Sequence, residues 1–264
     1  MNNKYSFLYA FLLFAAIGVA LWLSFDAVFY LFNFGYIGFF LSLGAFLTQR
    51  RNRYARNIVQ IGVGLYMFGL LGLMMRENMQ IEGLWYFLFL GMFQAAVIHY
   101  AVAKIAGPFL FGRGWCGYAC WTAAVLDLLP YKTPKNGRVK RLGILRYILF
   151  GLSFCFVAVL FAFQANNLDH IMYVSFIIGN LIYYIVGIAL ALILKDNRAF
   201  CKYVCPITVF LKPASYFSLL RIRVNQEDCV RCGKCKKACP MDVDMLDNKR
   251  SRENGTECIL ATIV

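Results

Sequence analysis

The chain has 264 residues, of which 61% are hydrophobic and only 15% are charged, and its formal net charge is +14. This composition excludes an ordinary soluble globule, in which about 25% of residues are charged. The positive charge taken alone would suggest a nucleic-acid partner, but its placement along the chain argues for a different role.

Six apolar stretches are long enough to cross a bilayer as helices, which takes about twenty residues each. Only helices and closed barrels satisfy their backbone groups in lipid, and runs of this length predict helices. The first stretch is too long for a signal peptide and has no small-residue cleavage site after it, so we interpret it as a retained span. The predicted spans cover residues 5–25, 28–47, 58–75, 84–106, 143–163 and 171–194.

The lysines and arginines predict the orientation of these spans. All 27 basic residues except Arg76 fall at or near one face, and the opposite face holds Asp26, Glu77 and Asp169. Because basic residues mark the cytoplasmic ends of spans, we predict a multi-pass protein of a bacterial or archaeal cytoplasmic membrane with both termini inside. Anionic lipid and an acidic soluble protein are then the expected partners, and nucleic acid is not. The basic residues after the second and fourth spans are Arg50, Arg51, Arg53, Arg56, Arg113, Lys132, Lys135, Arg138, Lys140 and Arg141.

An internal repeat follows the fourth and sixth predicted spans. Residues 113–122 read Arg-Gly-Trp-Cys-Gly-Tyr-Ala-Cys-Trp-Thr, and residues 198–208 read Arg-Ala-Phe-Cys-Lys-Tyr-Val-Cys-Pro-Ile-Thr. Cysteines four residues apart can share one face of a helical turn. Two such pairs together supply the four thiolates that a [4Fe–4S] cluster requires, and we predict one cluster at the membrane edge. Its ligands would be Cys116, Cys120, Cys201 and Cys205.

Other interpretations of residues near the repeat stay open. The four thiols could be packing residues, because unpaired cysteine is common in protein cores. Pro206 suits the first position of a helix and would place Cys205 near a helix N-terminus, which favours an anionic cluster. We expect Asp127 to be solvated or paired with Lys132, and His99 is a candidate contact for a quinone.

The C-terminal part contains a ferredoxin-type run of cysteines. Cys229, Cys232 and Cys235 are followed by Cys239 and a proline, the spacing that bacterial ferredoxins use for iron–sulfur clusters. Gly233 lets the loop turn where a side chain would clash.

A second run of the same kind opens at Cys258 but is incomplete. Its next two cysteines are due at positions that hold Ala261 and Val264. We therefore expect one cluster in the tail, held by the first three cysteines of the run and by either Cys239 or Cys258. Together with the membrane-edge site this predicts two [4Fe–4S] clusters per chain.

These paired elements and the ferredoxin run, over residues 109–240, resemble the polyferredoxin-like membrane proteins of the NapH, NosR and CcoG types. The resemblance implies a membrane-anchored [4Fe–4S] protein that relays electrons between the quinone pool or a cytosolic donor and a redox partner. It also implies that Cys239 serves the second cluster where both ferredoxin motifs are intact.

We predict an all-α integral membrane protein of about six transmembrane helices with a small cytoplasmic ferredoxin-like α+β tail, and all clusters on the cytoplasmic side. Its function would be that of an electron carrier subunit more than a stand-alone enzyme. The alternative is an iron–sulfur redox sensor, or an assembly factor for a respiratory enzyme. The expected parts are residues 1–106 (four spans), 107–142 (first cysteine pair and basic loop), 143–194 (two spans), 195–223 (second pair) and 224–264 (ferredoxin-type tail).

Overall fold

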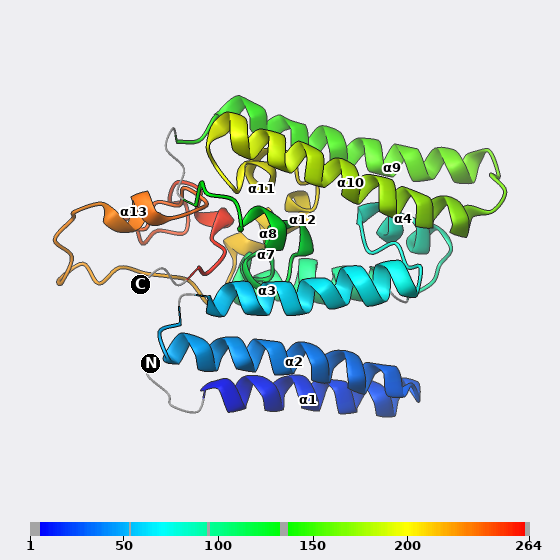
Figure 1. Cartoon of the computed structure of the whole chain (residues 1–264), viewed down its shortest axis with the longest axis horizontal. Helices are drawn as coiled ribbons and strands as arrows, with labels where there is room; N and C mark the ends of the chain where they lie inside the picture. The colour runs from blue at the N-terminus through cyan, green and yellow to red at the C-terminus, as the bar shows by residue number, and fades with distance from the viewer. Residues whose placement is uncertain (1–5, 53, 94–95, 133–136, 262–264) are drawn as a thin grey trace.

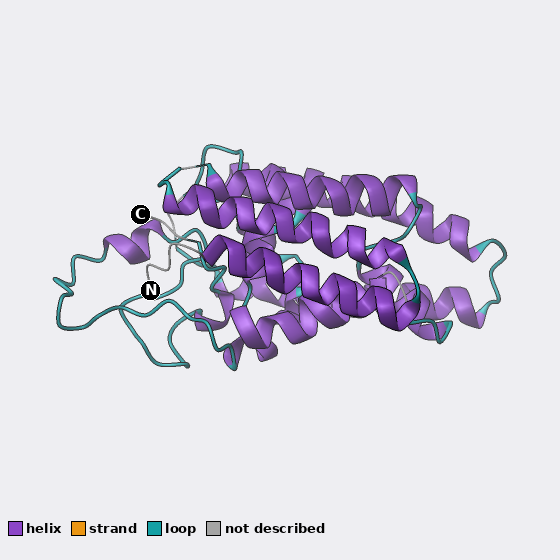
Figure 2. Cartoon of the chain, turned by 90° about the horizontal axis from the view of Figure 1, so that it is seen from below, coloured by secondary structure: helices purple, strands orange, loops and turns teal. Residues whose placement is uncertain are grey.

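The computed structural model describes residues 6–52, 54–93, 96–132 and 137–261, so Arg53, Lys135 and Val264 lie outside the described residues. Every regular element within these ranges is a helix and none is a strand (Figure 2). The all-α part of the predicted fold class is confirmed.

Within the described residues, five helices are long and apolar enough to cross a membrane. They run along the long axis of the molecule, and those formed by residues before position 75 lie on the opposite side from those formed by residues after position 139 (Figure 1). Their outer faces are apolar: Leu23 and Ile193, for example, are each 73% exposed, as lipid-facing residues are. The five spans are α1 (Ser6–Phe25), α2 (Val28–Gln49), α3 (Ala55–Leu65) with its π-helical continuation η1 (Tyr66–Met74), α9 (Leu145–Ala162) with the preceding 3-10 turn η3 (Lys140–Ile144), and α10 (Leu168–Leu194).

The fourth predicted span, residues 84–106, is not one continuous helix. Helix α4 (Ile81–Phe89) is capped by Leu90 and followed by Gly91, whose φ of +68° is the left-handed conformation common just after a helix end. The backbone N–H of Met92 donates to Phe87 O and that of Gly91 to Leu88 O, the two hydrogen bonds of a Schellman motif. An apolar helix shorter than the five spans then covers residues 96–111, as α5 (Ala96–His99), the π-helical η2 (Tyr100–Ala106) and α6 (Gly107–Phe111).

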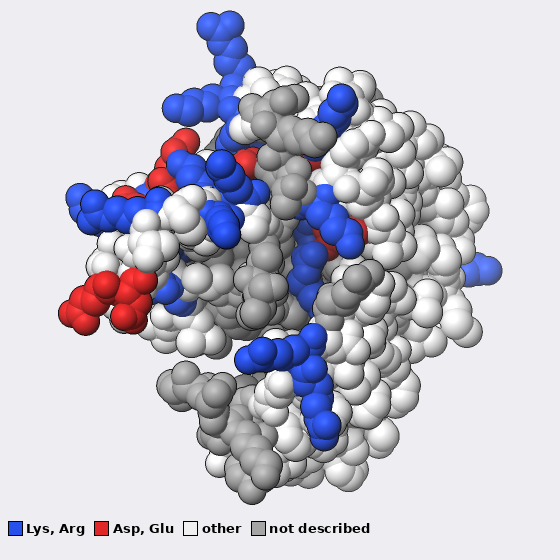
Figure 3. All heavy atoms as spheres, turned by 60° about the vertical axis from the view of Figure 1, so that its left-hand side comes forward, with Lys and Arg blue, Asp and Glu red and all other residues white. Residues whose placement is uncertain are grey.

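Short helices lie between α3 and α10 in the half of the bundle nearer the tail, and the tail extends beyond that end (Figure 1). The connection between α2 and α3, the start of α9 and the end of α10 lie at the same end. Viewed from this end, lysine and arginine side chains gather around it (Figure 3). This is the arrangement that the charge pattern predicts, while the side of the membrane on which it lies stays a prediction. The short helices are α7 (Gly114–Tyr118), α8 (Trp121–Leu126), α11 (Ala199–Tyr203) and α12 (Thr208–Tyr216).

The tail consists mostly of loops. Its described residues form one short helix, α13 (Lys234–Ala238), and one 3-10 turn, η4 (Gly255–Glu257). No strand occurs among them, so the α+β character predicted for the tail is not seen in this part of the chain.

Candidate iron–sulfur site

The two copies of the repeat form the same local structure. In the first, α7 carries Cys116 and α8 starts directly after Cys120; in the second, α11 carries Cys201 and α12 starts three residues after Cys205. In each copy a short helix ends between the two cysteines, so they flank a helix break instead of sharing one continuous turn. We predicted Pro206 as the first residue of a helix. In the structure Pro206 instead lies in the turn that precedes α12.

The four cysteines of the repeat lie together in one core, which we call the membrane-edge site. Cys116 and Cys201 are 8% and 6% exposed, and Cys120 and Cys205 are partly buried against the same core. Burial and then the neighbouring thiolates raise the pKa of Cys205 to about 12. Burial also acts to raise the pKa of Cys116, but the positive charges of Arg113 and Lys104 outweigh it and the pKa is lowered.

This donor set fits an iron–sulfur cluster. If all four clustered thiols ionised, the resulting thiolates would repel one another. A positively charged group is needed to offset that repulsion, and iron supplies this charge when it binds. Among the described residues, no three His, Cys, Asp or Glu side chains converge tightly enough for a single metal ion. Four cysteine thiolates are the ligand set of a [4Fe–4S] cluster.

The arginine that opens each copy reaches into the other copy. Arg113 Nη2 donates to Cys201 O over 3.4 Å, and Arg198 Nη1 donates to Cys116 O over 3.0 Å. Both arginines are buried, at 1% and 0% exposure. This reciprocal pair of hydrogen bonds links the two halves of the site and adds positive charge beside the thiols.

Each of these arginines has a buried carboxylate partner. Arg198 Nε and Nη2 donate to the two oxygens of Asp127 over 2.7 and 2.5 Å, the bidentate geometry of strong ion pairs. Arg56 pairs with the same carboxylate over 2.9 Å. The expectation that Asp127 is solvated or paired with Lys132 is therefore wrong, since its side chain is 5% exposed and is held by residues far away in the sequence.

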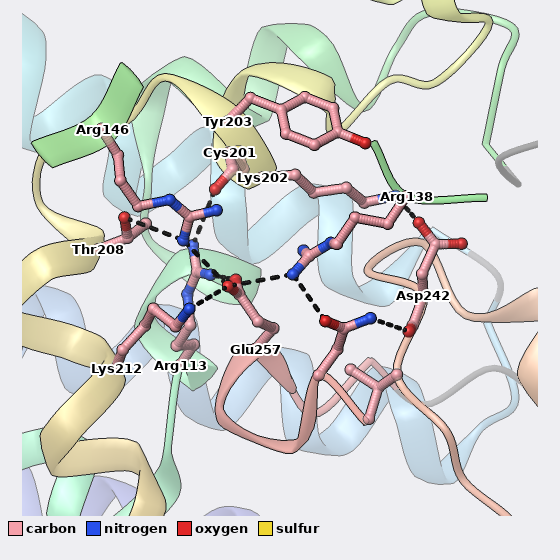
Figure 4. A network of polar contacts seen from close by, with 12 residues as sticks. Arg113, Arg138, Arg146, Cys201, Lys202, Tyr203, Thr208, Lys212, Asp242 and Glu257 are labelled. Carbon is pink, nitrogen blue, oxygen red and sulfur yellow. Dashed lines mark hydrogen bonds and ion pairs between the residues drawn. The ribbon is translucent and has the colours of Figure 1, made fainter. Parts of the chain in front are cut away.

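Arg113 pairs with Glu257 of the tail (Figure 4). Three more cations surround this carboxylate, with Arg146 at 3.0 Å, Arg138 at 3.3 Å and Lys212 at 3.5 Å. Glu257 is fully buried. Nothing in the sequence marked it as special, although it directly precedes Cys258.

Backbone contacts extend this junction between tail and repeat. The N–H of Arg113 donates to Cys258 O over 3.2 Å, and the Tyr118 hydroxyl donates to Leu260 O over 3.1 Å. A Cβ on Gly117 would lie 2.5 Å from Ile259 O, so only glycine permits this approach. The tail is therefore docked on α7, directly beside the membrane-edge site.

The tail cysteines fall into two sets. Cys239 and Cys258, the buried tail pair, are 6% and 9% exposed and belong to the same core as Cys116 and Cys201. Burial raises the pKa of the Cys258 thiol, and the charge of Cys239 adds to this shift. The other three, which we call the tail trio, lie nearer the surface: Cys229 is partly buried, and Cys232 and Cys235 are exposed.

The position of the buried tail pair bears on the fourth ligand of the tail trio. Cys239 and Cys258 lie close to each other, as cysteines of one second cluster would in an intact two-cluster ferredoxin. Which of the two completes a cluster with the tail trio stays open, because both are buried while Cys232 and Cys235 are exposed.

The matches to known families cover the four cysteines of the repeat and the tail cysteines up to Cys239. Residues 222–243 match one family of 4Fe–4S binding domains. Two ranges, residues 93–136 and 178–225, match a second family of the same description, and each range contains one copy of the repeat. No solved structure matches the chain. The matches support a polyferredoxin-like 4Fe–4S protein.

Several curated proteins are similar to parts of the chain. An uncharacterized protein of Methanocaldococcus jannaschii is 24% identical over 62% of this chain and 64% of its own length. The methylamine utilization ferredoxin-type protein MauN of Paracoccus denitrificans is 28% identical over 49% of the chain and 48% of its own length. The putative electron transport protein YccM of Escherichia coli is 41% identical over 22% of the chain and 16% of its own length. The chain thus spans less than two thirds of each of these relatives.

Proposed function

We propose that the chain carries single electrons through [4Fe–4S] clusters, between the quinone pool or a cytosolic donor and a redox partner protein. The observation that carries this proposal is the assembly of four cysteines from two distant repeats in one buried core. The names of the similar proteins, an electron transport protein and a ferredoxin-type protein, support the same function.

In this proposal Cys116, Cys120, Cys201 and Cys205 hold one cluster, and the tail trio with Cys239 or Cys258 holds a second. The cluster itself supplies reversible one-electron chemistry. The chain's own residues keep water from the thiols and place Arg113 and Arg198 beside them. Positive charge stabilises the more negative, reduced state, so we expect it to raise the reduction potential.

An apolar pocket of about 230 Å³ supports a quinone as the donor or acceptor. It is lined by residues that include Asn33, Met67, His99 and Trp115. His99 Nε2 and Asn33 Oδ1 are buried there without a partner among the described residues. A quinone ring with two oxygens matches an apolar pocket that offers a few polar groups. Because Trp115 directly precedes Cys116, the pocket adjoins the membrane-edge site.

Anaerobic purification followed by iron and sulfide analysis tests the proposal. We expect about eight irons and eight sulfides per chain, the content of two [4Fe–4S] clusters. Mixing the oxidised protein with a soluble quinol should bleach the cluster absorbance. About four irons would mean that either the membrane-edge cysteines or the tail cysteines are structural and hold no cluster. If the clusters are intact but neither a quinol nor a reduced ferredoxin reduces them, the alternative function of an iron–sulfur redox sensor would be favoured.

The quinone pocket has its own matched pair of variants. His99→Ala should slow reduction by a quinol while leaving reduction by dithionite unchanged. His170→Ala removes the other histidine of the chain, which is exposed and does not line the pocket, and should alter neither rate. Equal quinol rates in all three proteins would remove the pocket from the proposal.

A further inference from the structure

A second pocket, of about 520 Å³, opens where α9 begins. It lies at the same end of the bundle as the tail and is lined by η3, the first turn of α9, α12 and the loop before η4. We call it the basic pocket. Its cationic residues are Arg138, Lys140, Arg141, Arg146 and Lys212, and its other polar residues include Tyr203 and Asn254.

Positive charge in and around the basic pocket exceeds negative charge. Glu257 is the carboxylate that the structure places among these cations, and it pairs with Arg138, Arg146 and Lys212 as well as with Arg113 from outside the pocket (Figure 4). Asp242 and Asp196 also lie near Arg138, but both pair with Lys202, so positive charge still exceeds negative charge around the pocket. The exposed Lys140 and Arg141 add two more positive charges at the mouth.

Several guanidinium nitrogens of the basic pocket are buried without an acceptor among the described residues. These are Nε of Arg146 and both Nε and Nη2 of Arg138. Arg146 is 3% exposed, and a buried donor without an acceptor costs free energy. Arginine forks match the oxygens of phosphate in number and geometry, so a phosphate group would satisfy these donors and offset the charge together.

The rim of the basic pocket continues into the apolar surface of α9. Ile144 and Tyr147 line the pocket and are 59% and 48% exposed, and Ile148 beyond them is 50% exposed. An anionic phospholipid presents a phosphate next to its acyl chains, and this surface places cations next to an apolar face in the same way.

We propose that the basic pocket binds a phosphate-bearing anion at the membrane edge, and that the headgroup of an anionic phospholipid is the source that its apolar rim favours. Bound there, the phosphate joins the start of α9 to α12 and to the turn that carries Glu257. Binding therefore stabilises the docked tail. The site is separate from the cysteines and does not depend on electron transfer.

The test measures binding to the purified full chain in a neutral detergent by the shift of its thermal unfolding. Three probes are titrated: short-chain phosphatidylglycerol, short-chain phosphatidylcholine and inorganic phosphate. The variant carries Lys140→Gln and Arg141→Gln, which are exposed and take no part in the ion pairs of Glu257. Its matched control carries Arg50→Gln and Arg51→Gln, also exposed, at the same end of the bundle and outside the pocket.

We expect phosphatidylglycerol to raise the unfolding temperature of the unaltered protein and of the control equally. Loss of two cations at the mouth should weaken its binding about thirtyfold. A stronger response to phosphatidylglycerol than to phosphate identifies a lipid headgroup, and an equal response identifies a free phosphate. Either supports the site if the pocket variant alone is impaired. No shift with any probe, or equal shifts in variant and control, would overturn the proposal. Arg146→Gln is unsuitable as a variant, because the buried Arg146 pairs with Glu257 and its substitution would destabilise the fold.

Discussion

The membrane-edge site and the tail trio present the same ligand type in opposite surroundings. Cys116 and Cys201 are 8% and 6% exposed, and arginines on opposite copies of the repeat brace them. Cys232 and Cys235 are exposed and lie on or beside the five-residue helix α13. The difference indicates separate tasks. A buried site is insulated from solvent, whereas an exposed one can meet a soluble partner.

The largest effect should come from breaking the membrane-edge site. Cys116→Ser or Cys201→Ser leaves three thiolates where four are needed, so each should remove about half of the bound iron and the same spectroscopic signal. The double variant should do little further harm, because both residues act in one site. Iron analysis with electron paramagnetic resonance measures this. Cys155→Ser, an exposed cysteine of α9, is the control and should keep full iron.

Independent, additive losses in Cys116→Ser and Cys201→Ser would contradict a shared site. A substitution in the tail trio should likewise affect the tail cluster alone. Cys232→Ser should remove the other half of the iron and leave the membrane-edge signal intact. A loss of both signals in that variant would mean that the two sites are not separable.

The next effect concerns the buried ion pair between Asp127 and Arg198 at the membrane-edge site. Asp127→Asn leaves Arg198 buried with its carboxylate partner neutralised, and breaking a buried pair in this way costs about 3–5 kcal/mol. We expect a large fall in the unfolding temperature together with loss of the membrane-edge cluster. Asp244→Asn is the control, because its pair with Lys236 is half exposed and such pairs contribute about 0–1 kcal/mol. Equal falls in both variants would contradict the assigned role of Asp127.

A smaller effect is expected where the tail meets the repeat. Gly117→Ala forces a Cβ to within 2.5 Å of Ile259 O, and overpacking of this kind costs about 1–3 kcal/mol. The tail should become more sensitive to limited proteolysis while the bundle stays intact. Gly151→Ala is the control, because nothing lies within 4 Å of the added Cβ. Unchanged cleavage of the tail in Gly117→Ala would show that it does not need this contact.

The smallest effect is a pH dependence at the same junction. Burial and then the charges of Arg146, Arg138 and Arg113 lower the pKa of Lys212 to about 8, from an ordinary value of 10.5. Below pH 8 the fold must hold a charged amine among guanidinium groups, and this cost is relieved as the pH rises from 8 to 10.5. The unfolding temperature of the unaltered protein should therefore rise relative to Lys212→Gln over that range. If the difference in unfolding temperature between the two proteins does not change with pH, the lowered pKa of Lys212 is contradicted.

The sequence predicted the parts of the structure that depend on local pattern. Apolar length located five spans, and cysteine spacing located the thiols of the membrane-edge site, the tail trio and the buried tail pair. It did not predict the break near Gly91, because a glycine within an apolar run is common in spans and only the backbone conformation reveals a helix end. It also missed the partners of Asp127 and Glu257. Those ion pairs join residues 71 and 144 positions apart, and no spacing rule connects them.

The reciprocal arginines also constrain the order of events during biosynthesis. Arg113 and its acceptor at Cys201 are 88 positions apart, and two spans are made between them. A nascent chain that has released only the first copy therefore holds two thiols and an arginine with neither Glu257 nor Cys201 to pair with. If the four cysteines hold one cluster as proposed, iron can be loaded there only after the second copy has been inserted and folded against the first. Under the same proposal, a chain arrested between the two copies would stay without this cluster.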